Sequence, residues 1–134
     1  MVKTVFSIGL STGENLVIKK NRLEGTGGCG KGKRVAVVSG IHGDELEGQY
    51  VCYEIVRRIK ERPGLLDGTV DIYPALNPIG ITVASRKIPK LDMDMNRMFP
   101  GDEKGAVFER VAAAIIQDLA GADLCIDVHA SNRF

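Results

Sequence analysis

The stretch RVAVVSGIHGDELEG, at residues 34–48, decides the fold of this chain. It begins with a continuous apolar run, which is typical of a strand buried on both faces of a parallel sheet. The following residues predict a helix over about 44–62, with Asp44 as its N-terminal cap and Pro63-Gly64 as its end. Apolar positions recur on one face of this helix, at Leu46, Val51, Ile55 and Ile59. A buried strand that leads directly into a helix is the start of a βαβ unit.

The sequence on either side extends this unit to an α/β fold. Residues 68–76 predict the second strand of the βαβ unit, whose crossover should be right-handed. Residues 2–10 and 14–20 predict an antiparallel hairpin, because only a short Ser-Thr-Gly turn separates them. A second amphipathic helix over 108–119 and a last buried strand over 124–128 complete the predicted elements.

The composition excludes several classes of protein. A length of 134 residues suits one domain, and 44% apolar with 26% charged residues excludes a disordered or a membrane protein. The formal net charge of +1 creates no field that attracts nucleic acid or a membrane surface, so any function must come from a local site. We identify no secretory signal, and Cys29, Cys52 and Cys125 indicate no disulfide framework. We therefore expect a cytoplasmic protein with no nucleic-acid and no membrane partner.

A glycine cluster, GTGGCGKG at residues 25–32, has nearly the pattern of a phosphate-binding loop. Such a loop must follow a strand and open a helix, whose N-terminus then holds the phosphate. Here the next predicted element is a strand. In addition, Gly32 stands where a P-loop needs a Ser or Thr hydroxyl. We interpret the cluster as a flexible connection into the sheet.

Both histidines of the chain come directly after a buried strand. His42 follows the strand at 34–39, and His129 follows the strand at 124–128. In an open α/β sheet, ligands bind in the crevice beyond the carboxyl ends of the strands. Glu45 stands three residues after His42, and residues at this spacing share one face of a helix. His42, Glu45 and His129 form a candidate His₂Glu set, which is a ligand set of catalytic zinc sites with water in the fourth position.

A long irregular segment at 77–105 contributes further polar side chains. Loops of this length inside a compact domain are usually functional or disordered. Asn96 and Arg97 are adjacent donors, and an Arg fork with a neighbouring amide binds a carboxylate well. Arg86 is a second cation in the segment, and Asp94 is able to orient a ligating imidazole. A solvated, mildly basic loop is the alternative interpretation.

Three motifs, in this order, resemble the signatures of the succinylglutamate desuccinylase/aspartoacylase family, which belongs to the zinc carboxypeptidase group. They are GIHGDELEG at 40–48, DMNRMFPG at 94–101 and DVHAS at 127–131. Asn77-Pro78 and Ser85-Arg86 also stand where the family has its Asn-Pro pair and its loop arginine. The resemblance extends from about Arg34 to the C-terminus.

This resemblance implies a fold, a cofactor and a reaction. The implied fold is a three-layer α/β/α sandwich around a mixed, largely parallel sheet. The implied cofactor is Zn²⁺, bound by His42, Glu45 and His129. The implied reaction is hydrolysis of the amide bond of an N-acyl amino acid, or a similar small acylated amine, by a metal-activated water. The expected partner is therefore a small, carboxylate-bearing acylated substrate.

The resemblance also implies roles for the long segment. Asn96 and Arg97 would hold the substrate carboxylate. Arg86 would act as a catalytic residue that polarises the scissile carbonyl. Asp94 would orient His42 from the side of the ring that faces away from the metal.

One departure from the family pattern concerns the general base. In the family this base is a glutamate well downstream of the third zinc ligand, whereas only five residues follow His129 here. We therefore expect residues 1–134 to be one partial catalytic domain, truncated at the C-terminus. Its parts are the N-terminal strands with the glycine-rich connection, at 1–33, and the zinc-site core, at 34–134. A sheet that ends at 124–128 would expose unpaired backbone and apolar surface, so we expect a homo-oligomer or pairing with a missing C-terminal segment.

Two alternative functions stay open on this evidence. A metallocarboxypeptidase that cleaves peptides would use the same ligands and the same pair, Asn96 and Arg97. A non-catalytic metal-binding or assembly module is favoured by the missing base. A general base contributes roughly 10²–10⁴-fold to a rate, so the chain alone should be nearly inactive.

Overall fold

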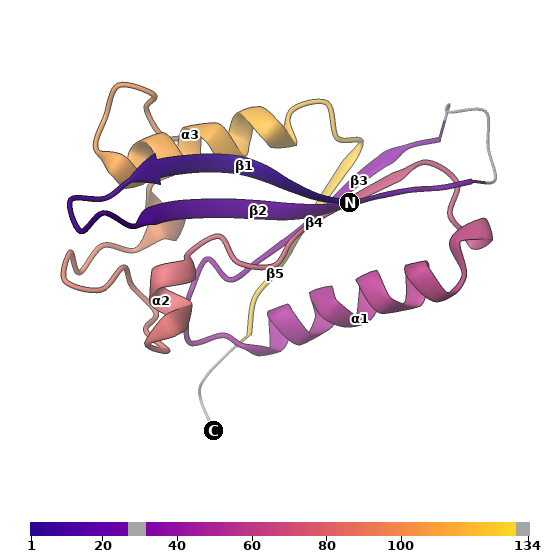
Figure 1. The fold of residues 1–134 in the computed structure, drawn as a ribbon, viewed down its shortest axis with the longest axis horizontal. Helices are drawn as coiled ribbons and strands as arrows, with labels where there is room; N and C mark the ends of the chain where they lie inside the picture. Colours follow the sequence, from indigo (N-terminus) through magenta and orange to yellow (C-terminus); the bar gives the residue numbers. More distant parts are fainter. Residues whose placement is uncertain (27–31, 131–134) are drawn as a thin grey trace.

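The computed structural model of the chain describes residues 1–26 and 32–130, and contains one five-stranded mixed sheet (Figure 1). In their order across the sheet, the strands are β1 (Val2–Gly9), β2 (Asn15–Glu24), β4 (Thr69–Tyr73), β3 (Arg34–Ser39) and β5 (Leu124–Val128). β2 is antiparallel to both of its neighbours, whereas β3 is parallel to β4 and to β5. The predicted mixed sheet is confirmed, and β4, β3 and β5 form its parallel part.

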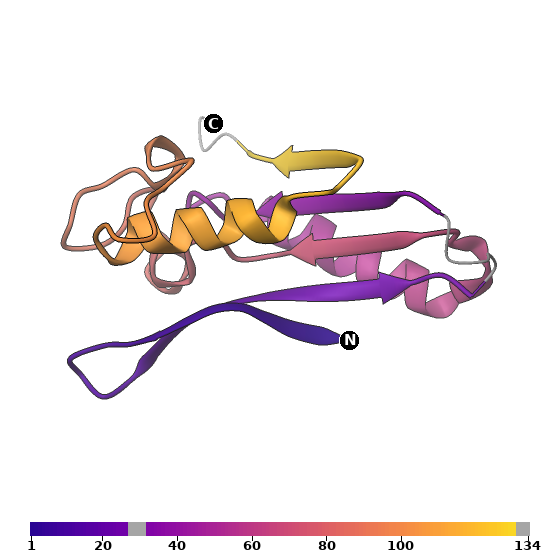
Figure 2. The same cartoon turned by 90° about the horizontal axis from the view of Figure 1, so that it is seen from above.

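Helices cover both faces of this sheet, so the predicted three-layer α/β/α architecture is also confirmed. Figure 2 shows α3 (Val107–Leu119) on one face and α1 (Glu47–Glu61) on the other. Three short helices lie in the connections: η1 (Pro63–Leu65), α2 (Pro78–Thr82) and η2 (Met95–Arg97). Across residues 1–26 and 32–130, none of the helices combines the length and the apolar character that crossing a membrane requires.

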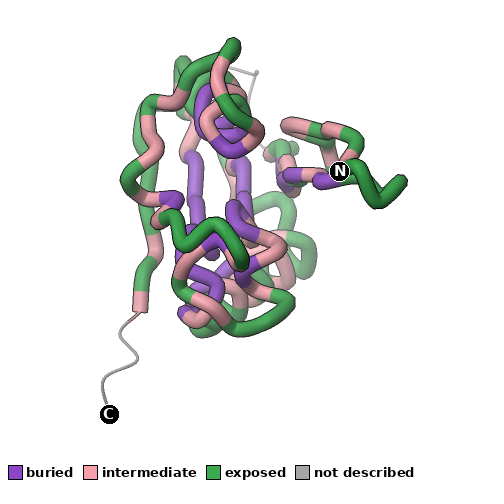
Figure 3. Tube along the Cα trace, turned by 90° about the vertical axis from the view of Figure 1, so that its left-hand side faces the viewer, coloured by how far each residue is buried: buried purple, intermediate pink, exposed green. Residues whose placement is uncertain are grey.

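The central strands are apolar on both faces because each face packs against a helix. On β3, Ala36 and Val38 belong to the core under α3, whereas Val37 belongs to the core under α1. On β4, Tyr73 belongs to the core under α3, and Ile72 belongs to the core under α1. In Figure 3 the buried residues accordingly gather along the middle of the sheet. This double burial explains the continuous apolar run from which the parallel strand was predicted.

The first helix begins later than the sequence predicts. α1 starts at Glu47 after Leu46, and no side chain caps it, so the prediction of Asp44 as the cap was wrong. The residues before Glu47 form turns instead, because Gly43 lies directly against the backbone of α2. A Cβ at Gly43 would lie only 2.0 Å from the carbonyl carbon of Gly80. This close approach turns the chain away from β3 before the helix can start.

The second strand is longer than predicted, because its charged residues are neutralised inside the fold. β2 continues past Lys20 to Glu24. Lys20 is only 4% exposed, and its Nζ donates to Asp118 at 2.5 Å and to Asp71 at 3.3 Å. Arg22 donates to both carboxylate oxygens of Asp71, at 2.7 and 2.6 Å. These ion pairs join β2 and β4 to α3, and they allow a strand to bury charges that look solvent-exposed in the sequence.

The glycine cluster and the long segment connect these elements. Most of the cluster, residues 27–31, lies outside the described residues; the elements on either side of it are the strands β2 and β3. The long segment at 77–105 contains α2 and η2, which the sequence did not predict. Asn77 caps α2 by accepting a hydrogen bond from the Gly80 N–H at 3.0 Å.

β5 lies at the edge of the sheet and is the least covered strand. It pairs with β3 on one side, and in the described part of the chain no strand pairs with its other side. Leu124 is 52% exposed and Ile126 is 43% exposed. The apolar exposure predicted for this edge is therefore present, whereas the partner that would cover it stays a prediction.

Candidate metal centre

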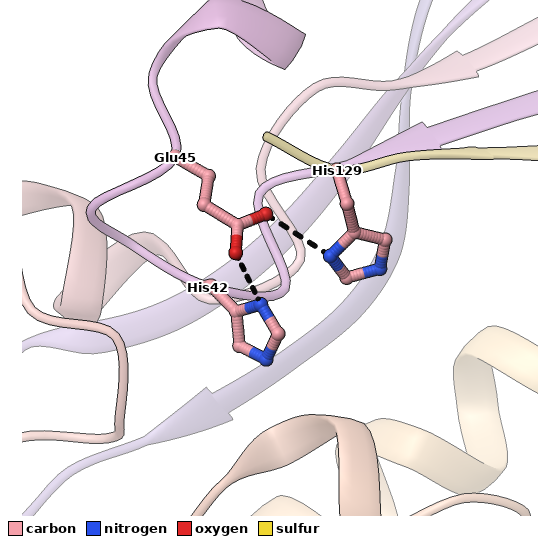
Figure 4. A group of neighbouring side chains, drawn as sticks. All are labelled: His42, Glu45 and His129. Atoms are coloured by element: carbon pink, nitrogen blue, oxygen red, sulfur yellow. Dashed lines mark hydrogen bonds and ion pairs between the residues drawn. The ribbon is translucent and has the colours of Figure 1, made fainter. Parts of the chain in front are cut away.

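Three predicted ligands meet beyond the carboxyl ends of β3 and β5. His42 and Glu45 lie in the turns between β3 and α1, and His129 directly follows β5. β3 and β5 are parallel neighbours, and their last residues are paired with each other. The segments that carry the three ligands therefore leave the sheet at the same end of these strands. Each of the three side chains offers one ligand atom, and these atoms all lie within 4.8 Å of one another (Figure 4).

The carboxylate of Glu45 lies between the two imidazoles. Its Oε1 is 2.8 Å from Nδ1 of His42, and its Oε2 is 3.0 Å from Nδ1 of His129. The backbone N–H of Ala130 donates a third hydrogen bond, to Oε2 at 2.9 Å. His42 and Glu45 are buried, with 3% and 6% exposure, whereas the His129 side chain is 33% exposed. The cluster is thus a half-open site with its buried side toward the β3–α1 turns.

Two predicted residues of the long segment also lie at this site. Asp94 Oδ1 is 3.3 Å from Nε2 of His42, on the side of the ring that faces away from Glu45. Arg86 donates from Nη1 to Oε1 of Glu45 at 3.2 Å, and its side chain is 52% exposed. The backbone explains this proximity, since the Gly43 N–H donates to the Ser85 carbonyl at 3.0 Å and fastens the long segment to the turn after β3.

Hydrogen bonding keeps the acidic groups ionised. Burial raises the pKa of Glu45, but hydrogen bonds from Ala130 and the two histidines outweigh burial, so this pKa lies below 4.5. Burial likewise raises the pKa of Asp94, and the Asn96 N–H together with the charge of His42 outweighs it, so the pKa lies below 3.8. Both groups are therefore carboxylates at neutral pH.

The donor set fits a divalent cation. Donor atoms of a tetrahedral zinc site with bonds of about 2.0–2.2 Å are roughly 3.3–3.6 Å apart, which is compatible with the 4.8 Å limit found here. Among the described contacts of the two imidazoles, the carboxylates are Glu45, Asp94 and Asp127, and the cation beside them is Arg86. Two negative charges are thus in excess when both histidines are neutral, and a divalent cation would balance them. Neutral imidazole and carboxylate are also ligands that zinc prefers.

The predicted pair Asn96 and Arg97 lies close to the site without touching its ligands. Both residues belong to η2, and Asp94 caps η2 by accepting a hydrogen bond from the Asn96 N–H at 2.9 Å. Asn96 is half-buried and Arg97 is exposed. Within the described residues, no hydrogen bond joins either side chain to His42 or Glu45, so both remain available to a ligand.

Comparison with known proteins now identifies the family. Residues 31–133 match the Succinylglutamate desuccinylase/Aspartoacylase catalytic domain. The chain belongs to this family. It is 31% identical over 105 residues to the N-alpha-acetyl-L-2,4-diaminobutyric acid deacetylase of Halomonas elongata, a match that covers 78% of this chain and 30% of the relative.

Solved structures of the succinylglutamate desuccinylase/aspartoacylase family have the same fold. The succinylglutamate desuccinylase/aspartoacylase of Rhodobacter sphaeroides superposes with a TM-score of 0.81 at 29% identity, over 97% of this chain and 40% of that one. A metallo-carboxypeptidase of Burkholderia cenocepacia shares the fold at 16% identity, with a TM-score of 0.71 over 98% of this chain and 36% of that one. The chain therefore spans less than half the length of these relatives.

Sequence reasoning missed two contributors to the site of this family member. The first is the backbone N–H of Ala130, which no side-chain pattern could reveal. The second is Asp127, whose Oδ2 lies 2.9 Å from Nε2 of His129. The sequence signal for Asp127 was its position two residues before His129, because residues at this spacing in an extended chain point to the same side. The helix-face argument for His42 and Glu45 was wrong, because both residues precede α1 and a turn brings them together.

Proposed function

We propose that this chain is the metal-binding part of a zinc-dependent hydrolase that cleaves the amide bond of an N-acyl amino acid or a similar small acylated amine. The observation that carries the proposal is the convergence of His42, Glu45 and His129, with negative charge in excess, in a member of this family. The deacetylase named above, which shares 31% of the aligned residues, supports an acylated amine as the substrate.

In this proposal His42, Glu45 and His129 hold the ion. Bound zinc supplies a water molecule of lowered pKa and polarises the substrate carbonyl. Arg86 binds the same carbonyl oxygen, because its half-exposed guanidinium extends over Glu45 at 3.2 Å and can turn toward a substrate. Its charge stabilises the negative charge that develops on this oxygen during hydrolysis.

Asn96 and Arg97 bind the substrate carboxylate in this proposal. The exposed Arg97 offers a planar fork of donors that matches a carboxylate, and the adjacent Asn96 amide adds another donor. The link from the Asn96 N–H to Asp94, and from Asp94 to His42, fixes the distance between this pair and the metal ligands. We infer that this fixed distance selects small substrates that carry a carboxylate.

The general base comes from outside the described residues in this proposal. At the donor cluster, the carboxylates of Glu45, Asp94 and Asp127 already contact imidazole nitrogens. None of the three is therefore free to accept the proton of an attacking water. We expect the 134-residue chain to bind metal and substrate, with turnover reduced roughly 10²–10⁴-fold relative to a family member that has its base.

Zinc binding by the purified, metal-stripped protein tests the proposal. Competition with a chromophoric chelator should give one zinc per chain, and the double variant His42→Ala, His129→Ala should lose this binding. Asp92→Asn is the control, because Asp92 is an exposed carboxylate that pairs with Lys87 in the same segment. Equal zinc affinity of the double variant and the parent would show that His42 and His129 do not bind the zinc ion.

Two rival functions require different assays. A metallocarboxypeptidase, favoured by the shared fold of the Burkholderia protein, would hydrolyse a short peptide faster than an N-acyl amino acid. A protein that also contains the remaining length found in the relatives should be used for this comparison. A non-catalytic metal-binding module, favoured by the occupied carboxylates, would be excluded by hydrolysis with the zinc-loaded 134-residue chain.

A further inference from the structure

The two histidines of the site are held in different ways. His42 is 3% exposed, so the surrounding core fixes its ring. The His129 side chain is 33% exposed and follows β5, the edge strand whose Leu124 and Ile126 are also exposed. Packing therefore constrains the ring of His129 less than the ring of His42, and a less ordered ligand binds metal more weakly because binding must order it.

Asp127 supplies the contact that packing does not. Its Oδ2 lies 2.9 Å from Nε2 of His129, and the other ring nitrogen, Nδ1, lies 3.0 Å from Oε2 of Glu45. The ring is thus engaged at both nitrogens. In Figure 4, Nδ1 of His129 points to the Glu45 carboxylate, so this nitrogen faces another candidate ligand.

The same arrangement occurs on the other histidine. His42 directs Nδ1 to Glu45 at 2.8 Å and Nε2 to Asp94 at 3.3 Å. The two imidazoles, which follow two different strands, therefore each have an aspartate at Nε2 and the shared Glu45 at Nδ1. A carboxylate on the outer nitrogen of a ligating histidine fixes its tautomer and raises the basicity of the inner nitrogen.

We propose that Asp127 is a positioning residue for His129: its carboxylate accepts the Nε2–H and keeps Nδ1 directed at Glu45 and at a metal ion. This inference rests on the proposed zinc site. Asp127 does not touch the metal or the substrate. The hydrogen bond matters more for His129 than the equivalent bond from Asp94 matters for His42, because His129 lacks the surrounding core.

The affinity of zinc for Asp127 variants tests this assignment. Asp127 is 42% exposed, so its replacement leaves no buried charge unpaired and the variants should fold. Asp127→Ala should weaken zinc binding about 10–100-fold, the range found for outer partners of metal ligands. Asp127→Asn should fall between Asp127→Ala and the parent, because an amide oxygen still accepts a hydrogen bond from Nε2.

Asp123→Ala is the matched control for Asp127→Ala. Asp123 precedes β5 and accepts a hydrogen bond from the Arg34 N–H at 2.8 Å, so it fastens the other end of the same strand. If Asp127 acts only by holding β5 in place, both substitutions should weaken zinc binding equally, and this result would overturn the proposal. A selective loss in the Asp127 variants supports it.

NMR relaxation of the His129 ring in the metal-free protein gives a second readout that does not depend on zinc. The ring should be ordered in the parent and in the Asp123 control variant, and it should become more mobile in Asp127→Ala, because one of its two hydrogen bonds is lost. Equal ring order in the parent and in Asp127→Ala would overturn the assignment. If the parent failed to bind zinc, the proposed function would fail, and this measurement would still decide the role of Asp127.

Discussion

The backbone nitrogen of Ala130 lies 2.9 Å from Oε2 of Glu45, although 85 residues separate the two in the chain. The same oxygen contacts His129, so Glu45 attaches the end of β5 to the turn after β3. Glu45 therefore combines two tasks: it is a candidate metal ligand, and it joins the two segments that carry the other ligands.

The substitution Glu45→Gln should separate these tasks. The amide keeps one oxygen for Ala130 and loses the negative charge, so zinc binding should fall below detection. The free energy of unfolding should fall by about 1.5–3 kcal/mol, the contribution of hydrogen bonds to a charged group. Chelator competition and thermal melts measure the two effects. Glu61→Gln, at a carboxylate with 54% exposure, should leave both unchanged, and zinc binding by Glu45→Gln at the parent's affinity would refute the ligand role.

Gly43→Ala should disrupt the turn that carries His42 and Glu45. A Cβ at this position would meet the backbone of Gly80 at 2.0 Å, and rigid backbone cannot yield as a flexible side chain can. We expect a loss of more than about 2 kcal/mol in unfolding free energy, together with weaker zinc binding. Gly64→Ala is the control, because nothing lies within 4 Å of its Cβ. Chemical denaturation of both variants makes the comparison, and similar midpoints would contradict the tight contact.

Asp71 should make stability depend on pH in the acidic range. Burial raises its pKa, but hydrogen bonds from Arg22 and Arg34 and the charge of Lys20 outweigh burial and lower it from 3.8 to about 2. A lowered folded-state pKa stabilises the fold above the unfolded value, and the gain disappears as the pH falls toward the folded value. About 2 kcal/mol should therefore be lost between roughly pH 4 and pH 2.

The variant Asp71→Asn isolates this contribution. At pH 7 it leaves Lys20, Arg22 and Arg34 without their common carboxylate, and breaking such a buried pair costs about 3–5 kcal/mol. Between pH 4 and pH 2 its stability should change less than that of the parent. Urea denaturation at several pH values measures both curves, and parallel curves would assign the acid sensitivity to other carboxylates.

Arg97→Gln should weaken binding of carboxylate ligands to the zinc-loaded chain. The loss of a charge-assisted hydrogen bond of about 1.5–3 kcal/mol corresponds to a 10–150-fold increase in the Kd of an N-acyl amino acid. Calorimetry of ligand binding provides the measurement. Arg58→Gln, at an arginine of α1 whose side chain is 75% exposed, should bind the ligand as the parent does. An unchanged Kd in Arg97→Gln would remove this residue from the binding site.

The exposed edge of β5 should associate with another strand. Exposed apolar side chains next to unpaired backbone favour such pairing, either with a second copy of the chain or with a polypeptide segment like those that lengthen the relatives. Ile126→Lys should therefore shift sedimentation toward the monomer, whereas Leu65→Lys, at a leucine of 80% exposure on η1, should not. A parent protein that sediments only as a monomer would contradict this expectation for the isolated chain.

Local patterns in the sequence predicted the sheet, the two long helices and the residues that meet at the site. They succeeded where one physical cause dominates, as in the doubly buried β3 or the amphipathic α3. They failed where distant segments decide the outcome. Lys20 and Arg22 look like the polar end of a strand until Asp71, 51 residues further along the chain from Lys20, is placed beside them.

The start of α1 was mispredicted for a related reason. Asp44 has the chemistry of a helix cap, and local propensity favours a helix from this residue. The contact between Gly43 and α2 prevents it, and this contact depends on the long segment returning to the sheet. The same turn still brings Glu45 beside His42, so the predicted proximity of these two residues is present, although the helix-face argument for it was wrong.

The position of β5 also links ion binding to the integrity of the sheet. One of the three candidate ligands, His129, directly follows β5, an edge strand that pairs only with β3 in the described part of the chain, while the other two ligands are buried. An ion bound by all three ligands would oppose the detachment of β5 from β3. An ion that binds only the form with β5 attached stabilises that form, and the stabilisation grows with the logarithm of the ion concentration. Detachment of this strand would in turn release the ion. Zinc concentration should therefore govern hydrogen exchange at the edge of this sheet more strongly than at its centre.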